Sequence, residues 1–262
     1  LKSLKEKYNL KDLEVFSQDT LDYRVTFSAN NLKQADLTQR NGYAVRLIDN
    51  KKLGFASAFG DTNLEELVKK AKNLSKYSPD LEIKFPSNTK KDAKTSSNQQ
   101  SDTNPENNLE DFKSKGLEVI DSILKEAPGV LVDISFDFNQ LKEEIKNSND
   151  LSCFLESNTY SFSASIKETN ENDFIEVFTA AVDIKLPEYK SYISELLNLY
   201  NLSKKQAKIK NGKYPVLFTS KAAKELFGFV EDAINGKMIV EKSSPWVEKL
   251  NKQILSKNLT IK

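Results

Sequence analysis

The sequence contains no histidine among its 262 residues and only one cysteine, Cys153. A hydrolytic zinc site needs about three protein ligands, which nearly always include histidine or cysteine, and it leaves one position open for water. A single thiol cannot supply that set, and carboxylates alone favour Mg²⁺ or Ca²⁺. The composition therefore argues against a chain that cuts peptides with its own zinc ion, and we expect no metal or other cofactor.

The single cysteine also excludes a disulfide framework within the chain and is typical of a reducing compartment. No stretch approaches the roughly 18 apolar residues that a membrane-spanning helix needs. The first residues, LKSLKEKYNL, contain no apolar core of a secretion signal. These features predict a cytoplasmic protein that does not contact a membrane.

Arginine is also scarce. Only Arg24, Arg40 and Arg46 occur, and 39 basic residues balance 38 acidic ones to give a net charge of +1. Proteins that read DNA usually present a basic face with several arginines for bidentate contacts to bases. Because charges of both signs are interspersed along this chain, we expect no direct contact with nucleic acid.

The first 86 residues are predicted to form an antiparallel meander followed by a helix. Runs of alternating apolar and polar residues, which are typical of half-buried strands, occur at 13–17, 22–28, 32–40, 43–49 and 53–58. Asn41-Gly42 suits a type I′ hairpin, and a second turn is predicted at 50–52. Thr62 to Glu65 matches a capping box, which would begin a helix that continues to about Lys76.

A polar tract follows this module. Residues 87–108 contain one apolar residue, Ala93, and therefore cannot bury enough surface to offset the entropy lost on ordering. We interpret the tract as a disordered linker. The remaining chain, 109–262, alternates helical stripes with strands, predicted at 109–124, 130–146, 151–156, 161–168, 174–184 and 189–200. The predicted fold is α+β, with antiparallel sheets and packed helices in two sub-domains, 1–86 and 109–262.

A strand followed by a helix is predicted at 214–236. The run from Tyr214 to Phe218 suits a buried strand, and Thr219 or Ser220 can cap the next helix through a hydroxyl. Gly236 suits a helix exit that needs a positive φ. A second helix is predicted after Ser244, because Pro245 is favourable in a first helical turn.

The run LFGFVEDAINGKMIVEKSSPWVEKLNKQIL, residues 226–255, resembles the TldD/PmbA family, and its PmbA (TldE) branch in particular. That family has been named modulator of DNA gyrase and microcin-processing peptidase. Its amino-terminal pattern is also present, carried here by Gly42, Arg46, Gly54, Ala56 and Ser57. The NSND turn and the strand SNTYSFSASI, residues 157–166, are similar to the family's serine-rich strand. The resemblance covers nearly all of this chain, and we expect the family's β-rich carboxy-terminal part to be absent.

The resemblance implies a role. In the TldD branch the matching helix carries a zinc-binding HExxxH motif, whereas this chain has Gly-Phe-Val-Glu-Asp-Ala at 228–233. The metal ligands of the family therefore have no counterpart here. The resemblance implies a non-catalytic subunit that partners a TldD-like zinc peptidase in processing or degrading peptides. Candidates for contacts to a peptide or a partner are Arg46, Ser161, Ser163, Phe229, Glu231 and Asp232.

Several alternatives stay open at the level of sequence. Arg46 suits a structural ion pair as well as a substrate contact. Ser161 and Ser163 could line a peptide path, or could belong to an edge strand with one wet face. The chain could also be a regulator that binds DNA gyrase or toxin peptides, or an inert truncated module.

Overall fold

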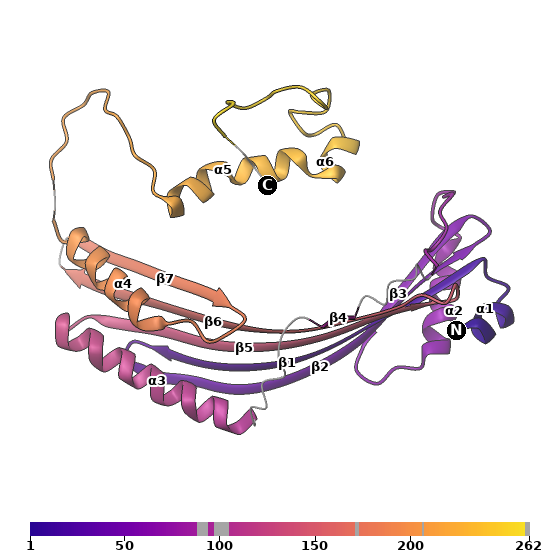
Figure 1. Cartoon of the computed structure of the whole chain (residues 1–262), viewed down its shortest axis with the longest axis horizontal. Coiled ribbons are helices and arrows are strands. Elements are labelled where there is room, and N and C mark those ends of the chain that lie inside the picture. Colours follow the sequence, from indigo (N-terminus) through magenta and orange to yellow (C-terminus); the bar gives the residue numbers. More distant parts are fainter. Residues whose placement is uncertain (88–93, 97–104, 171–172, 206, 260–262) are drawn as a thin grey trace. The chain divides into compact units, whose positions relative to one another are not determined.

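A computed structural model describes residues 1–87, 94–96, 105–170, 173–205 and 207–259. The chain divides into two compact units, unit 1 (Leu1–Gln206) and unit 2 (Ala207–Lys262). Strands and helices are both present, and nearly all strand pairs are antiparallel (Figure 1). The predicted α+β class is therefore confirmed.

The strands of unit 1 form one sheet in the order β3-β2-β1-β5-β6, with β4 and β7 both paired to β6. Their bounds are β1 (Asp12–Ser28), β2 (Asn31–Asp49), β3 (Lys52–Phe59), β4 (Lys94–Ser96), β5 (Leu131–Asn147), β6 (Ser152–Asn170) and β7 (Asp173–Asp183). The sequence analysis divided these strands between separate sheets. The antiparallel pairing of β1 with β5 instead joins them, because fourteen residue pairs from Glu14↔Asn147 to Phe27↔Ile134 connect the two strands.

Three strands are longer than the sequence predicted. The turn predicted at Asn41-Gly42 is wrong: both residues lie inside β2, where Gly42 pairs with Gln18 and with Phe59. A strand with partners on both sides satisfies its backbone polar groups, and that requirement overrides the local turn preference of Asn-Gly. The β1–β2 hairpin turns at Ala29 and Asn30, which both have positive φ.

Four helices accompany the sheet: α1 (Lys2–Lys7), α2 (Leu64–Ser75), α3 (Pro105–Glu126) and α4 (Tyr189–Ser203). The cap of α2 lies one residue later than the predicted Thr62, because the Asn63 side chain accepts from the backbone N–H groups of Glu65 and Glu66. Much of the predicted linker at 87–108 lies outside the described residues. Within it, 94–96 form β4 and Pro105 begins α3.

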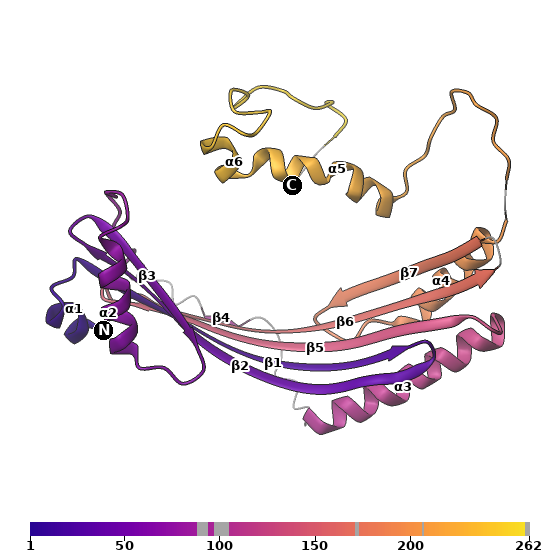
Figure 2. The ribbon, with the colours of Figure 1, turned by 180° about the vertical axis from the view of Figure 1, so that it is seen from behind.

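All four helices pack on one face of the sheet. Along β1, Leu13 belongs to a cluster with α1 and α2, whereas Tyr23, Val25 and Phe27 belong to a cluster with α3 and α4. Odd-numbered residues of one strand share a face, so the two clusters lie on the same side, at opposite ends of the strands. Figures 1 and 2 show α2 near one end of the sheet and α3 along the other.

Unit 2 contains α5 (Ser220–Ile234) and α6 (Gly236–Val240). The predicted helix is confirmed, and its Thr219 cap accepts from the Ala222 N–H. The predicted strand from Tyr214 to Phe218 is wrong: the segment forms no strand, and Leu217 is 92% exposed. The described residues of unit 2 include no other strand with which the segment could pair.

Two further expectations for unit 2 are corrected. Gly236 does not end α5 with a positive φ, because Asn235 is the cap in an extended conformation and Gly236 begins α6. The residues after Ser244 form turns rather than a helix. The buried Ser244 hydroxyl donates to the Ala233 carbonyl at 2.6 Å and accepts from the Trp246 N–H, so it fastens this segment to α5.

Candidate functional site

The face of the unit 1 sheet opposite its four helices, here called the helix-free face, is lined by polar side chains. On β6, Ser161, Ser163 and Ser165 are partly exposed, and the residues between them are buried against the helices. The serines therefore lie on one face, whereas the sequence analysis had left them on alternate sides. Strand β6 is also internal, with β5 on one side and β7 on the other, so the edge-strand explanation for these serines is wrong.

All three arginines of the chain lie on this face, and each forms an ion pair with a carboxylate of a neighbouring strand. Arg24 pairs with Asp137, Arg40 with Asp22, and Arg46 with Glu14. The arginine side chains are at least half exposed, and their carboxylate partners are more deeply buried. The acids therefore fix guanidinium groups that still point donors toward solvent.

The acids beneath this face are held ionised by their neighbours. Burial raises the pKa of Asp22, but hydrogen bonds from Asn139 and Arg40, both at 2.6 Å, outweigh it and leave the pKa below its ordinary value. At Asp133, burial likewise raises the pKa. The Lys167 ammonium at 2.7 Å and the Ala29 N–H at 2.8 Å lower it further than burial raises it. The face consequently carries fixed charges of both signs at neutral pH.

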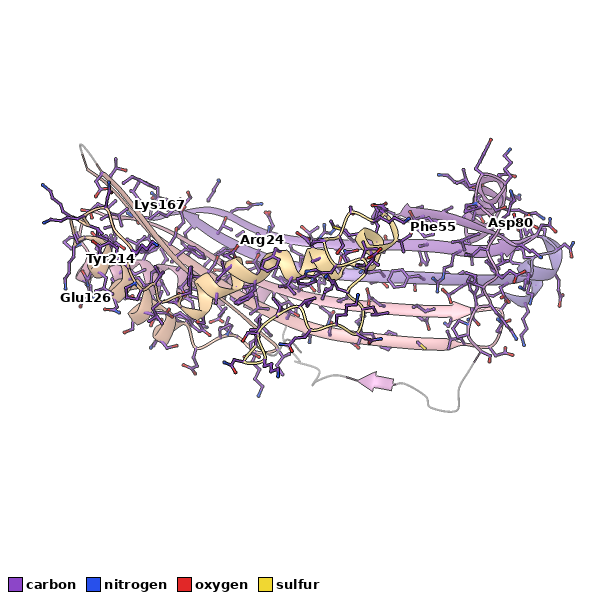
Figure 3. The ribbon with its side chains drawn as sticks, turned by 90° about the horizontal axis from the view of Figure 1, so that it is seen from above. Arg24, Phe55, Asp80, Glu126, Lys167 and Tyr214 are labelled. Atoms are coloured by element: carbon purple, nitrogen blue, oxygen red, sulfur yellow. The ribbon has the colours of Figure 1, made fainter. Side chains whose placement is uncertain are left out.

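Ser161 and Ser163 lie within this network. Across the sheet, Ser161 is the register partner of Asp137 on β5, and Ser163 is the partner of Ser135. The Ser135 hydroxyl donates to Asp137 at 2.7 Å. Figure 3 views this sheet with Arg24 and Lys167 labelled. The predicted serines, an arginine and an aspartate thus form one hydrogen-bonding surface.

Arg46 lies on the same face but toward the other end of the strands. Its partner Glu14 is ten residues from Arg24 along β1, about 33 Å at the usual rise of an extended strand. The Arg46 guanidinium also lies 5.1 Å from the ring centroid of the buried Phe85. Of the two interpretations of Arg46, the structural ion pair is observed, and a substrate contact stays a prediction.

The remaining candidates, Phe229, Glu231 and Asp232, belong to α5 of unit 2. Val230 and Ala233 are the buried residues of this turn, whereas both carboxylates are exposed. The Phe229 ring meets Trp246 edge-on, with 6.1 Å between centroids. Within the described part of the chain, no three His, Cys, Asp or Glu side chains gather closely enough to hold a metal ion. Nor is any described helix long and apolar enough to cross a membrane.

Sequence reasoning missed Arg24, Asp133 and Asp137 as members of this face. A signal was present, because polar residues occupy every second position in DYRVTFS (22–28) and in DISFDFN (133–139). Alternation shows that such residues share the solvent side of a strand. It does not show that β1 and β5 are neighbours, and that pairing brings Arg24 to Asp137.

Two segments of the sequence match models of one family. Residues 13–75 match PmbA/TldA metallopeptidase domain 1. Residues 211–262 match the PmbA/TldA metallopeptidase C-terminal domain. The second segment lies in unit 2, which the sequence analysis had included in a central domain. A search among curated proteins found no match.

Three solved structures share the fold. TldE from Thermococcus kodakarensis is 16% identical with a TM-score of 0.74, and a proposed modulator of a DNA gyrase from Thermotoga maritima is 14% identical with a TM-score of 0.76. Each comparison covers 94% of this chain. A proposed modulator of DNA gyrase from Bacteroides thetaiotaomicron is 18% identical with a TM-score of 0.77, over 97% of this chain. The chain spans 57% to 60% of the lengths of these three proteins.

The fold and the site define a mixed α+β protein built on one long sheet, with helices on one face and a polar, ion-paired surface on the other. With both matched segments in hand, the chain is assigned to a family. It belongs to the PmbA/TldD family.

Proposed function

We propose that this chain is a non-catalytic, TldE-like subunit that binds peptides on its helix-free face and partners a TldD-like zinc metallopeptidase. The observation that carries the proposal is the absence of histidine from all 262 residues. The resemblance noted in the sequence places an HExxxH motif on the matching helix of the TldD branch. In α5 the corresponding turn has two exposed carboxylates and no imidazole, so a partner would have to supply the zinc ion.

The helix-free face supports the peptide-binding part of the proposal. An extended peptide presents N–H and C=O groups and needs matching acceptors and donors. Hydroxyl groups serve as both, and serines occupy three alternate positions on β6 beside the Arg24–Asp137 pair. Short hydroxyl side chains recognise the backbone without selecting bulky side chains, which suits a protein that handles unfolded peptides. A cytoplasmic location agrees with the single cysteine and belongs to the same proposal.

The partner part of the proposal is tested by reconstitution. The full chain is purified alone, its zinc content is measured by mass spectrometry, and cleavage of an unfolded peptide is followed by chromatography. We expect neither stoichiometric zinc nor cleavage. A TldD-like protein that carries HExxxH is then added, and we expect co-elution on size exclusion together with a rise in cleavage. One zinc per chain with hydrolysis by the lone chain would contradict the proposal.

The role of the face is tested with a matched pair of variants. Ser163→Lys places a bulky cation among the serines of β6, and Ser203→Lys makes the same change at the exposed end of α4. We expect Ser163→Lys to lower the reconstituted cleavage while co-elution persists, and Ser203→Lys to change neither. Equal effects of the two variants would argue against peptide binding on this face. Recovery of DNA gyrase instead of a TldD-like protein would favour the regulator alternative.

A further inference from the structure

A cavity of about 500 Å³ opens on the helix-free face near the β1–β2 hairpin. Its lining comes from β1, β2, β5, β6 and β7 and includes Arg24, Lys33, Asp133, Ser163 and Phe178. This volume is within the range of small-ligand sites, which runs from roughly 300 to 1,000 Å³. The cavity lies within unit 1 and combines charge, hydroxyl groups and an aromatic ring.

Lys33 is brought into the cavity by an irregularity of the sheet. The β1–β2 register changes between Thr26, which pairs with Gln34, and Phe27, which pairs with Leu32. Lys33 is therefore the extra residue of a β-bulge. Bulges redirect side chains and are frequent beside functional sites. In a regular strand, residues 33 and 34 would alternate between faces, yet both of them line this cavity.

The charge of the lining favours an anion. Lys33 is exposed, and its ammonium makes no hydrogen bond or ion pair with any described residue. Arg24 uses its Nε for Asp137, and its side chain remains 61% exposed. Asp133, the acid in the lining, already accepts from Lys167 and from the Ala29 N–H. Two cations with free donors therefore face a cavity whose acid is satisfied.

The opposite wall is apolar. Phe178 on β7 is 68% exposed and is the register partner of Ser165. Four inter-strand steps separate β2 from β7, about 19 Å between backbones. The side chains of Lys33 and Phe178 shorten that span and leave room for one or two peptide residues, since consecutive Cα atoms are about 3.8 Å apart.

We propose that this cavity binds the free carboxyl terminus of a peptide, with the carboxylate at Lys33 and Arg24 and an apolar or aromatic terminal side chain on Phe178. The choice of a peptide rests on the proposed function, whereas the carboxylate and the apolar group follow from the lining. An ammonium and a guanidinium fork are both strong donors to a carboxylate. The serines of β5 and β6 would meet the preceding peptide group.

The test uses N-acetyl-Phe-Phe as free acid and as carboxamide, titrated calorimetrically into the full chain at low salt. The acid is expected to bind at least about tenfold more tightly than the amide, which corresponds to about 1.4 kcal/mol. Lys33→Gln should reduce that preference, and its lack of a partner means that folding is not disturbed. Arg24→Lys keeps the charge but loses the fork and should weaken binding of the acid. Phe178→Ser should remove the preference for Phe-Phe over Ala-Ala.

Arg40→Gln is the matched control, because Arg40 forms a similar inter-strand ion pair on the same face and does not line the cavity. Unchanged binding by this variant supports the proposal. Equal affinity for acid and amide, no binding of either, or an equal loss in Arg40→Gln would overturn it. These outcomes are independent of reconstituted cleavage. A chain that restores cleavage without preferring the acid refutes this site alone, whereas one that prefers the acid without restoring cleavage refutes the partner role alone.

Discussion

The ring of Phe27 in β1 lies against the backbone of Gly116 in α3, so closely that a Cβ at position 116 would be 2.1 Å from Cε2 of the ring. Phe27 is 2% exposed and belongs to the core formed by the sheet with α3 and α4. The absence of a side chain at one helical position therefore sets how closely α3 approaches the sheet beneath the proposed site.

Gly116→Ala should destabilise unit 1 despite the higher helix propensity of alanine. The gain of about 1 kcal/mol from propensity is opposed by overpacking of a rigid ring, which costs about 1 to 3 kcal/mol. Urea unfolding followed by circular dichroism measures the net loss. Combining the change with Phe27→Leu should recover part of it, and a stabilised single variant would show that α3 can move away freely.

Gly54→Ala should be more damaging than the same substitution at Gly228. A Cβ at Gly54 would be 2.2 Å from the Ala71 carbonyl oxygen of α2, so the helix backbone would have to move. We expect a loss of about 1 to 3 kcal/mol. At Gly228 in α5 nothing lies within 4 Å of the added atom, and a gain of about 0.5 to 1 kcal/mol is expected from propensity. Thermal unfolding of both variants checks the contrast, which a loss at Gly228 would contradict.

Removing Arg46 should cost more than removing the whole Arg46–Glu14 pair. The Glu14 side chain is 5% exposed, so Arg46→Ala leaves a buried carboxylate without its partner. We expect a loss of about 1 to 3 kcal/mol, below that for fully buried pairs because Arg46 is half exposed. Adding Glu14→Gln should restore part of this stability in a double-variant cycle of unfolding measurements. Strictly additive losses would show that the pair is not coupled.

Glu65 should make stability depend on acid pH. Hydrogen bonds from Lys7 and then from Tyr8 lower the pKa of Glu65 from 4.5 to about 2. A carboxyl group with a depressed pKa stabilises the fold above its unfolded pKa, and that contribution is lost as the pH falls toward the folded value. Glu65→Gln should therefore be less stable than the parent at pH 7. The difference should shrink between pH 4.5 and 2 and vanish below that range, as measured by urea unfolding at each pH. A constant difference across this range would contradict the assignment.

The sequence by itself determined which segments form helices in unit 1 and which residues of a strand share a face. Helical periodicity located α3 and α4, and alternation along β6 separated the serines from the buried residues between them. These features are local, because they depend on spacings of two to four residues. The absence of histidine also bounded the chemistry without any structure.

Only the tertiary structure decided which strands are neighbours. Local preference at Asn41-Gly42 and the apolar run at Tyr214 to Phe218 both gave wrong expectations, the first because β2 is paired on both sides and the second because the run has no partner strand among the described residues. Strand pairing joins residues more than a hundred positions apart, such as Arg24 and Asp137. No short spacing in the sequence encodes that neighbourhood, and so the charged face and the cavity beside Lys33 emerge only from the folded sheet.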